Sequence, residues 1–174
     1  MMCMGIEDDA TTQRLNDETR IPMRMVVMLF VLPVLLWAAV ASFTGKCVGI
    51  SDGDTIKVLK NGVETKIRLY GVDCPEKKQD YGTKAKEFTA DFCFGKTVRV
   101  DEKGTDRYGR VIGEVFVDGV SLNRALVENG FAWWYVQYAK KDADLGVLEE
   151  KARKAKKGLW AGSSPVEPWE FRRK

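Results

Sequence analysis

The sequence of 174 residues contains no histidine at all. This absence excludes an imidazole general base, a Ser-His or Cys-His nucleophile pair, and a His-liganded zinc site. Any catalysis in this chain must therefore depend on carboxylates and guanidinium groups. Where a metal takes part, it would be an oxygen-liganded hard cation such as Ca²⁺ or Mg²⁺.

Long hydrophobic runs are limited to residues 25–45, which carry no charge and are preceded by Arg24. A run of this length can just span a bilayer, which would make it a membrane anchor. It also ends in Ala39-Val40-Ala41, a pattern suited to signal-peptidase cleavage after Ala41, and this favours a signal peptide. Because the arginines precede the run, both interpretations place the domain after it outside the cytoplasm, either secreted, periplasmic or anchored.

The segment ahead of this run, residues 1–24, is polar and has no motif of its own. Met23-Arg24-Met25 would make a conventional signal-peptide start, so residues 1–22 are consistent with a mis-assigned start codon. Contact with a membrane is expected only if the apolar segment is retained.

Cysteine is scarce, with four residues at positions 3, 47, 74 and 93. They show no CxxC or other metal-binding spacing, which argues against a zinc site. Export would permit a disulfide, but cleavage after Ala41 leaves an odd number of cysteines. Buried cysteines that pack as small hydrophobes are the simpler interpretation.

Residues 46–164 contain no repeat or low-complexity tract and are predicted to form one domain, followed by a basic tail at residues 165–174. Alternating or β-rich patterns predict five strands, near residues 47–50, 55–59, 64–72, 97–100 and 111–117. Helical patterns cover residues 81–93, a short stretch after Ser121, and residues 144–157. This order predicts an α+β domain, a five-stranded OB-like β-barrel with three helices.

Three short segments concentrate acids and arginines: Asp-Gly-Asp-Thr at residues 52–55, Arg-Leu-Tyr-Gly-Val-Asp-Cys-Pro-Glu at residues 68–76, and Asp-Arg-Tyr-Gly-Arg at residues 106–110. Each segment alone is compatible with an ordinary turn or a local ion pair. Together they supply carboxylates for a cation and guanidinium groups that match phosphate geometry, which favours phosphoryl chemistry.

In order, spacing and identity, these segments resemble the staphylococcal (micrococcal, thermonuclease-type) nuclease family. Further matches occur at residues 119–127, 130–132 and 158–160, so the resemblance covers residues 46–160. The family has a five-stranded OB-type barrel with three helices, in agreement with the pattern of predicted strands and helices.

The resemblance implies a Ca²⁺ site. Its carboxylate ligands would be Asp54 and Asp73, and the backbone carbonyl of Cys74 would be a further ligand. Many relatives have threonine at this last position, but a main-chain ligand tolerates cysteine. Asp52 is similar to an acidic neighbour that shapes the site.

The resemblance also implies roles for side chains that meet the substrate. Glu76 would orient or deprotonate the attacking water, and Arg68 and Arg110 would bind the phosphate. Tyr108 resembles the aromatic contact beside the nucleotide, and Tyr138 is a second candidate for a stacking surface. The net charge of +3 is compatible with a polyanionic partner.

The resemblance, together with the apolar segment, implies an exported, monomeric, Ca²⁺-dependent endonuclease that hydrolyses DNA and RNA with little sequence preference and leaves 3′-phosphate ends. The alternative is a non-catalytic module on the same barrel that binds nucleic acid or protein. Such relatives typically lose the acids and arginines, whereas this chain keeps Asp54, Arg68, Asp73, Glu76 and Arg110 together.

Overall fold

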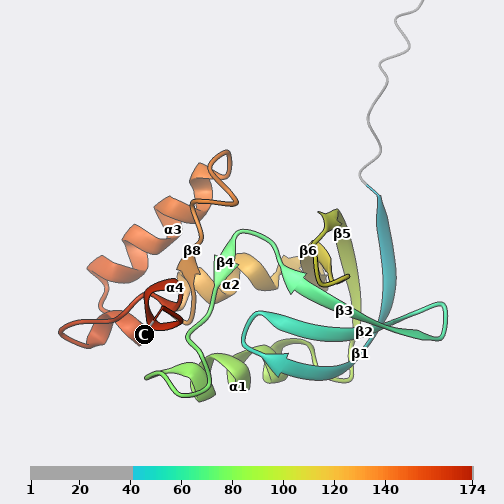
Figure 1. Cartoon of the computed structure of the whole chain (residues 1–174), viewed down its shortest axis with the longest axis horizontal. Helices are drawn as coiled ribbons and strands as arrows, with labels where there is room; N and C mark the ends of the chain where they lie inside the picture. The colour runs from blue at the N-terminus through green and yellow to red at the C-terminus, as the bar shows by residue number, and fades with distance from the viewer. Residues whose placement is uncertain (1–40, 174) are drawn as a thin grey trace, which may run out of the picture. The chain divides into compact units, whose positions relative to one another are not determined.

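The strand pattern predicted from the sequence folds into a barrel in the computed structural model, which describes residues 41–173 (Figure 1). The predicted apolar segment, apart from its last five residues, and the polar segment before it lie outside the described residues. The strands are β1 (Ser42–Asp52), β2 (Thr55–Lys60), β3 (Val63–Leu69), β4 (Val72–Asp73), β5 (Thr97–Thr105), β6 (Val111–Val117), β7 (Val120–Ser121) and β8 (Trp133–Trp134). The helices are α1 (Gly82–Cys93), α2 (Leu122–Glu128), α3 (Ala143–Lys154), the 3₁₀ turn η1 (Gly158–Ala161) and α4 (Pro168–Phe171).

Five strands close the barrel in the order β3-β2-β1-β5-β6, and a parallel pairing between β3 and β6 completes the circle. The long strand β1 serves two neighbours, because residues 42–46 pair with β5 and residues 46–52 pair with β2. Register shifts after Cys47 and after Ile50 mark the bulges at which β1 bends. The predicted five-stranded barrel in an α+β domain is confirmed.

The hairpin between β2 and β3 turns at Asn61-Gly62, where both residues have positive φ (51° and 81°). This is the backbone that a two-residue hairpin of twisted strands requires, and Asn-Gly adopts it readily. The turn fixes the register that sets Arg68 opposite Thr55, and so brings the first two sequence segments together.

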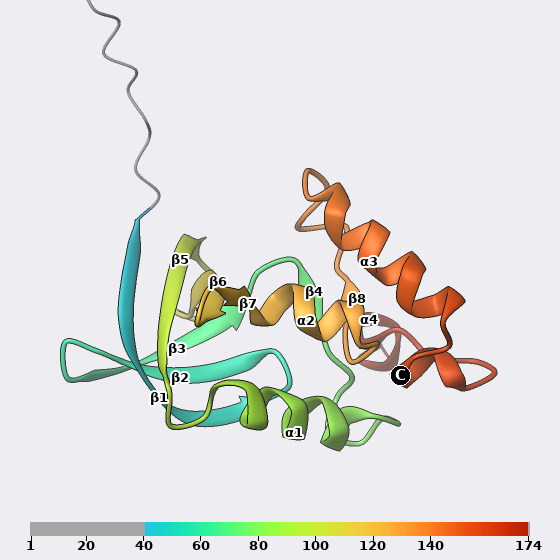
Figure 2. The same cartoon turned by 180° about the vertical axis from the view of Figure 1, so that it is seen from behind.

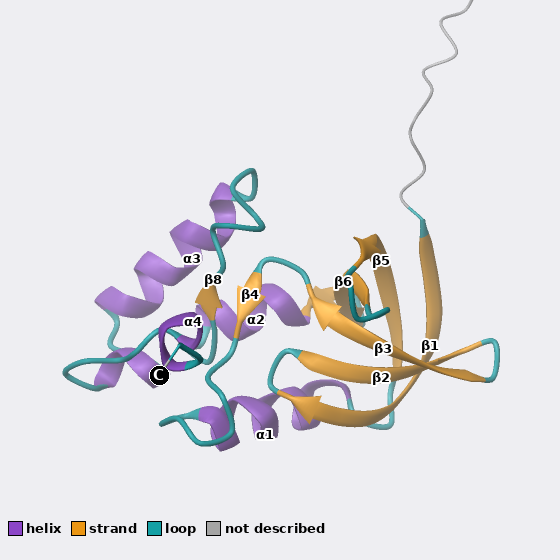
Figure 3. Ribbon diagram, viewed as in Figure 1, coloured by secondary structure: helices purple, strands orange, loops and turns teal. Residues whose placement is uncertain are grey.

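One face of each barrel strand supplies the core. Its fully buried members include Ile56, Val58, Ile67, Val98 and Val115. Two helices close the barrel, since α1 packs against β1 and α2 packs against β6, while α3 lies against α2 (Figures 2 and 3). A second apolar cluster, formed by Trp133, Ala152, Leu159 and Trp160, joins β8 to α3 and η1.

The structure corrects several predicted boundaries. β1 begins at Ser42, five residues before the predicted strand at residues 47–50, and β5 extends to Thr105, five residues beyond the predicted end at residue 100. The predicted strand over residues 64–72 is two strands, because Gly71 has a positive φ of 75° and turns the chain between β3 and β4. A fourth short helix, α4, lies within the predicted tail. No helix within residues 41–173 is long and apolar enough to cross a membrane.

Candidate active site

Asp54 is held at the turn between β1 and β2, with its carboxylate buried. The backbone N–H of Cys74 donates to Asp54 Oδ2 at 2.8 Å, and Thr55 Oγ1 donates to Oδ1 at 3.1 Å. The preceding Gly53 permits this contact between segments, because a Cβ there would lie 2.9 Å from the side chain of Cys74. The Asp-Gly-Asp turn is thus built to bring Asp54 against the β4 segment.

Asp73 lies at the end of β4 and is completely buried. Its strand pairs antiparallel with β8, which aligns Asp73 with Trp133. The turn before β4 is supported by Asn123 of α2, whose Nδ2 donates to the Tyr70 carbonyl at 2.9 Å and whose Oδ1 accepts from the Val115 N–H at 3.1 Å. A buried amide therefore fixes where the second carboxylate stands.

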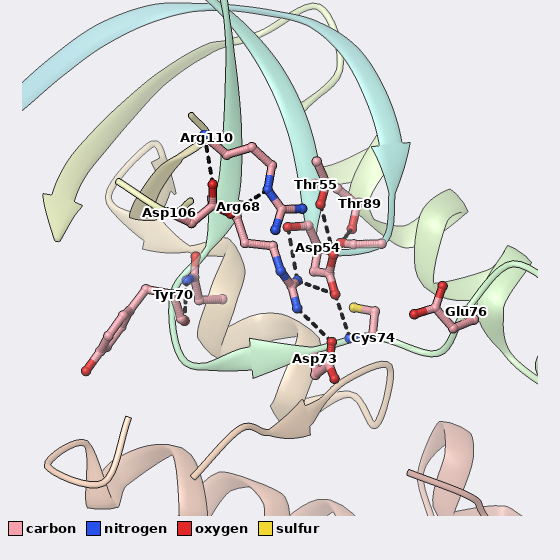
Figure 4. Close-up of polar contacts among 12 residues, drawn as sticks. Asp54, Thr55, Arg68, Tyr70, Asp73, Cys74, Glu76, Thr89, Asp106 and Arg110 are labelled. Carbon is pink, nitrogen blue, oxygen red and sulfur yellow. Dashed lines mark hydrogen bonds and ion pairs between the residues drawn. The ribbon is translucent and has the colours of Figure 1, made fainter. Parts of the chain in front are cut away.

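Arg68 of β3 joins the two aspartates. Its Nη1 forms an ion pair with Asp54 Oδ2, and its Nη2 lies 2.7 Å from Asp73 Oδ1. Figure 4 shows the guanidinium reaching between the carboxylate of Asp54, from the turn between β1 and β2, and that of Asp73, from β4. The structure thus brings Asp54, Arg68 and Asp73 together as the sequence analysis predicted, although their catalytic roles stay predictions.

Glu76 follows Pro75 on the segment beyond β4, with a partly exposed side chain. Its Oε1 lies 2.7 Å from Nη1 of Arg172, and Nη2 of the same arginine lies 2.8 Å from Asp73 Oδ2. A residue of the predicted tail therefore connects the two carboxylates. The sequence analysis missed Arg172, because one arginine in a basic terminus is most often a solvated charge.

Arg110 stands at the end of the loop before β6. Asp106 holds this loop: its Oδ1 accepts from the N–H of Tyr108 at 2.9 Å and of Arg110 at 3.0 Å, and its Oδ2 lies 2.7 Å from Arg110 Nε. In Figure 4 the Arg110 side chain extends toward Asp54 and Arg68. The two predicted phosphate-binding arginines thus face the same cluster.

Tyr108 and Tyr138 are both exposed. The Tyr108 ring lies 4.8 Å from the guanidinium of Arg107 and 5.5 Å from that of Arg110, whereas Tyr138 packs against Tyr135 at 4.8 Å. Within residues 41–173 no hydrogen bond or ion pair links either phenol to the aspartates. Both rings therefore present exposed surface, and that of Tyr108 lies next to the Arg110 guanidinium.

Asp52 is exposed at the end of β1, across the turn from Thr55. It lies near enough to Cys74 to disfavour ionisation of that thiol. Asp52 is therefore a neighbour of the cluster rather than a bound member of it.

Burial and charge act in opposite directions on the ionisable groups. Burial raises the pKa of Asp73 above its ordinary value, although the guanidiniums of Arg172 and Arg68 favour the charged form. Burial alone would lower the pKa of Arg68, but the charges of Asp54 and Asp73 raise it by more, so the pKa lies above its ordinary value and the guanidinium stays charged. The pKa of the Cys74 thiol is raised well above its ordinary value by burial and by Asp54, so the sulfur is a neutral thiol and not a thiolate ligand.

The donor set suits a hard cation. Asp54, Asp73 and Glu76 carry three negative charges against the two positive charges of Arg68 and Arg172, and the charge of Arg110 is paired with Asp106, which leaves an excess of one negative charge. Carboxylate oxygens are the donors that Ca²⁺ prefers. Within the described residues no three His, Cys, Asp or Glu side chains are arranged as a ready metal site. Asp54 and Asp73 are the buried carboxylates that could hold a cation, with backbone oxygen, such as that of Cys74, and water as further ligands.

Arg68, Asp73, Glu76 and Arg110 lie within a region that matches a known family, whereas Asp54 and Arg172 lie outside it. Residues 66–162 match the family described as "Staphylococcal nuclease homologue". The chain belongs to the staphylococcal nuclease family. An Escherichia coli protein named "Uncharacterized endonuclease" is 42% identical over 149 residues, covering 85% of this chain and 94% of that protein.

Two further relatives carry nuclease names. The "Micrococcal nuclease" of Shigella flexneri is 38% identical over 156 residues, covering 84% of this chain and 88% of that protein. A staphylococcal-like nuclease of Arabidopsis thaliana is 40% identical over 108 residues, covering 62% of this chain and 33% of that protein. The predicted family is confirmed, and by this homology the chain is a nuclease of the staphylococcal type.

Proposed function

We propose that this staphylococcal-type nuclease is an exported, monomeric, Ca²⁺-dependent endonuclease that hydrolyses DNA and RNA with low sequence specificity. The products would carry 3′-phosphate ends. One observation carries the proposal: Asp54 and Asp73, which are far apart in sequence, converge on one arginine, with Glu76 and Arg110 beside them.

The arginines would stabilise the negative charge that develops in the transition state of the reaction. A phosphodiester is already anionic, so it repels an attacking hydroxide, and its five-coordinate transition state gathers further negative charge. When bound, the cation supplies positive charge at a non-bridging oxygen. Arg68 and Arg110 would add two guanidinium forks where that charge develops. At about 4 Å and an effective dielectric of about 20, each such charge pair contributes on the order of 4 kcal/mol before desolvation.

Glu76 is the proposed base. It stands three residues beyond Asp73 and after the rigid Pro75, which keeps it near the cation ligands. Its partly exposed carboxylate can accept a proton from a water beside the scissile phosphate, a role that histidine fills in many other hydrolases.

Low sequence specificity is expected from the groups that the site offers. Its charged groups would contact phosphate, which carries no sequence information. The exposed rings of Tyr108 and Tyr138 offer stacking surfaces that accept any base. Both DNA and RNA are therefore proposed substrates.

Export is supported by where the barrel begins. Because Ser42 is the first residue of β1, cleavage after Ala41 would keep all of β1 and would remove the hydrogen bond that the Glu102 N–H donates to the Ala41 carbonyl. An anchor over residues 25–45 would instead share its last four residues with β1, and the remaining 17 residues are at the lower limit for spanning a bilayer. This overlap favours the signal-peptide interpretation over the membrane anchor.

The proposal is tested by incubating the purified full chain with plasmid DNA and with RNA, in Ca²⁺ or in chelator, followed by analysis of the product ends. Cleavage of both substrates in Ca²⁺ alone, with 3′-phosphate ends, is the expected result. Asp144→Asn is a matched control, since Asp144 is an exposed carboxylate whose ion-pair partner is Arg124 and not a residue of the cluster. This variant should cleave like the wild type. Binding without cleavage, or cleavage that resists chelator, would overturn the proposal.

A further inference from the structure

The C-terminal segment of the chain closes onto the candidate active site through one side chain. Arg172 lies 99 residues beyond Asp73 in sequence, yet its Nη2 is 2.8 Å from Asp73 Oδ2, and its Nη1 is 2.7 Å from Glu76 Oε1. Residues 163–174 also lie beyond the region that matches the family. The contact thus joins the C-terminal segment to two carboxylates of the candidate site.

Apolar contacts anchor this segment independently of the arginine. Trp169 of α4 stacks on Tyr135 with ring centroids 5.1 Å apart and planes inclined by 2°, and it meets Trp133 edge-on at 5.9 Å. Gln79 Nε2 donates to the Val166 carbonyl at 3.1 Å, and Pro168 is buried. Both views of the fold place α4 beside β8, which pairs with the strand that carries Asp73 (Figures 1 and 2). The backbone can therefore stay docked while the Arg172 side chain moves.

Asp73 has positive neighbours on both sides. Arg68 approaches Oδ1, and Arg172 approaches Oδ2. A divalent cation on Asp73 would meet repulsion from both guanidiniums, and one of them must give way. Arg68 is only 16% exposed and is bound to a second buried aspartate, whereas Arg172 is 41% exposed and extends from a four-residue helix. Arg172 is the one that can leave.

We propose that Arg172 is a positioning residue that binds Asp73 Oδ2 and holds Glu76, and that a divalent cation and Arg172 compete for the Asp73 carboxylate. In the cation-free protein, Arg172 neutralises Asp73 and keeps Glu76 from acting as a base. Cation binding releases Arg172 and so frees Glu76. This inference rests on the proposed function, because it assigns Asp73 to the cation.

Competition and a purely structural contact predict opposite changes in Ca²⁺ affinity when Arg172 is removed. If Arg172 only stabilised the site, its removal would weaken Ca²⁺ binding or leave it unchanged. If it competes, Arg172→Gln should bind Ca²⁺ more tightly, by roughly tenfold for each 1.4 kcal/mol of competition removed. Arg173→Gln is a matched control, because Arg173 has the same charge, is 74% exposed and pairs only with Glu170 among the described contacts.

The test is calorimetric titration of the full chain with Ca²⁺ at fixed ionic strength, for the wild type, Arg172→Gln and Arg173→Gln. Tighter binding by Arg172→Gln alone supports competition, and unchanged or weaker binding overturns it. Thermal unfolding gives a second measurement, in which Arg172→Gln should unfold at a lower temperature in chelator and gain more from Ca²⁺ than the wild type gains. Arg172→Lys should be intermediate in both measurements, because a single ammonium cannot bridge the two carboxylates.

The outcome also separates this inference from the proposed function. If the wild type cleaves nucleic acid only with Ca²⁺ but Arg172→Gln binds the ion no more tightly, competition alone fails. If no variant binds Ca²⁺, competition fails, and the cleavage assay in Ca²⁺ and chelator decides whether the nuclease proposal fails with it.

Discussion

The barrel wall and the loop before β6 each supply one arginine to the same cluster, and the two arginines differ in burial and in the number of their ion-pair partners. Arg68 projects from β3, is almost enclosed and binds two buried aspartates. Arg110 ends a loop, is more exposed and, among the residues that the structure describes, forms an ion pair with Asp106 alone. Breaking a buried charge cluster is costly, whereas an exposed pair contributes little to stability. The difference teaches that fold stability and phosphate chemistry are coupled at Arg68 and separable at Arg110.

The largest effect is expected for Arg68→Ala. It leaves Asp54 with no ion-pair partner among the described residues and Asp73 with only Arg172, so the free energy of unfolding should fall by about 3–5 kcal/mol. Turnover should fall by about 10³-fold or more. Urea unfolding followed by circular dichroism, with cleavage rates measured below the transition, checks both effects. Arg68→Lys should recover part of the stability and little of the activity, and a variant as stable as the wild type would break the comparison.

Arg110→Ala should separate the two effects. Turnover is expected to fall by about 10³–10⁵-fold, since a charge-stabilising arginine is lost. The free energy of unfolding should change by less than about 1 kcal/mol, because only the partly exposed pair with Asp106 is broken. Initial cleavage rates and urea unfolding measure the two quantities. Arg107→Ala is the control, since the side-chain contacts of Arg107 within residues 41–173 are with the exposed Tyr108, through its ring and its hydroxyl. Equal losses in both variants would count against a specific role for Arg110.

Glu76→Gln extends the comparison from the arginines to a carboxylate of the site. Loss of the base should reduce turnover by about 10²–10⁴-fold at neutral pH. Stability should hardly change, since the pair with Arg172 is partly exposed on both sides. Single-turnover cleavage rates test this, with Glu170→Gln as control for loss of an acid in an exposed arginine pair. Activity near the wild-type level in Glu76→Gln would remove the assigned base.

The smallest expected effect belongs to Asn123→Ala, which touches no charged group of the site. It leaves the Val115 N–H and the Tyr70 carbonyl without their side-chain partner, at a cost of about 1–3 kcal/mol in unfolding free energy. Thermal unfolding measures this loss, and Asn129→Ala, which removes a single local bond to the Ala125 carbonyl, should cost less. Equal losses would mean that Asn123 does not support the turn that carries Asp73.

Most of this site could be predicted because three short segments together resemble the staphylococcal nuclease family, although each segment alone is compatible with an ordinary turn. The Asn-Gly hairpin and the Asp-Gly-Asp turn place Arg68 and Asp54 close together from their own sequence. The break at Gly71 was missed, because Val72 and Asp73 continue a strand-like pattern and only the positive φ reveals the turn. Arg172 was missed because its partners lie 99 and 96 residues earlier. Trp169 was missed as an anchor for a similar reason, since it acts only through the rings of Trp133 and Tyr135.

The most direct test of the central claim is Ca²⁺ titration of the full chain beside its Asp54→Asn variant. The amide keeps the size of the side chain and can still accept the hydrogen bond from the Cys74 N–H, so the fold should persist. If the two buried aspartates share one cation, Asp54→Asn should lose measurable binding while its circular dichroism stays that of the wild type. Equal Ca²⁺ affinity in the two proteins would contradict the account.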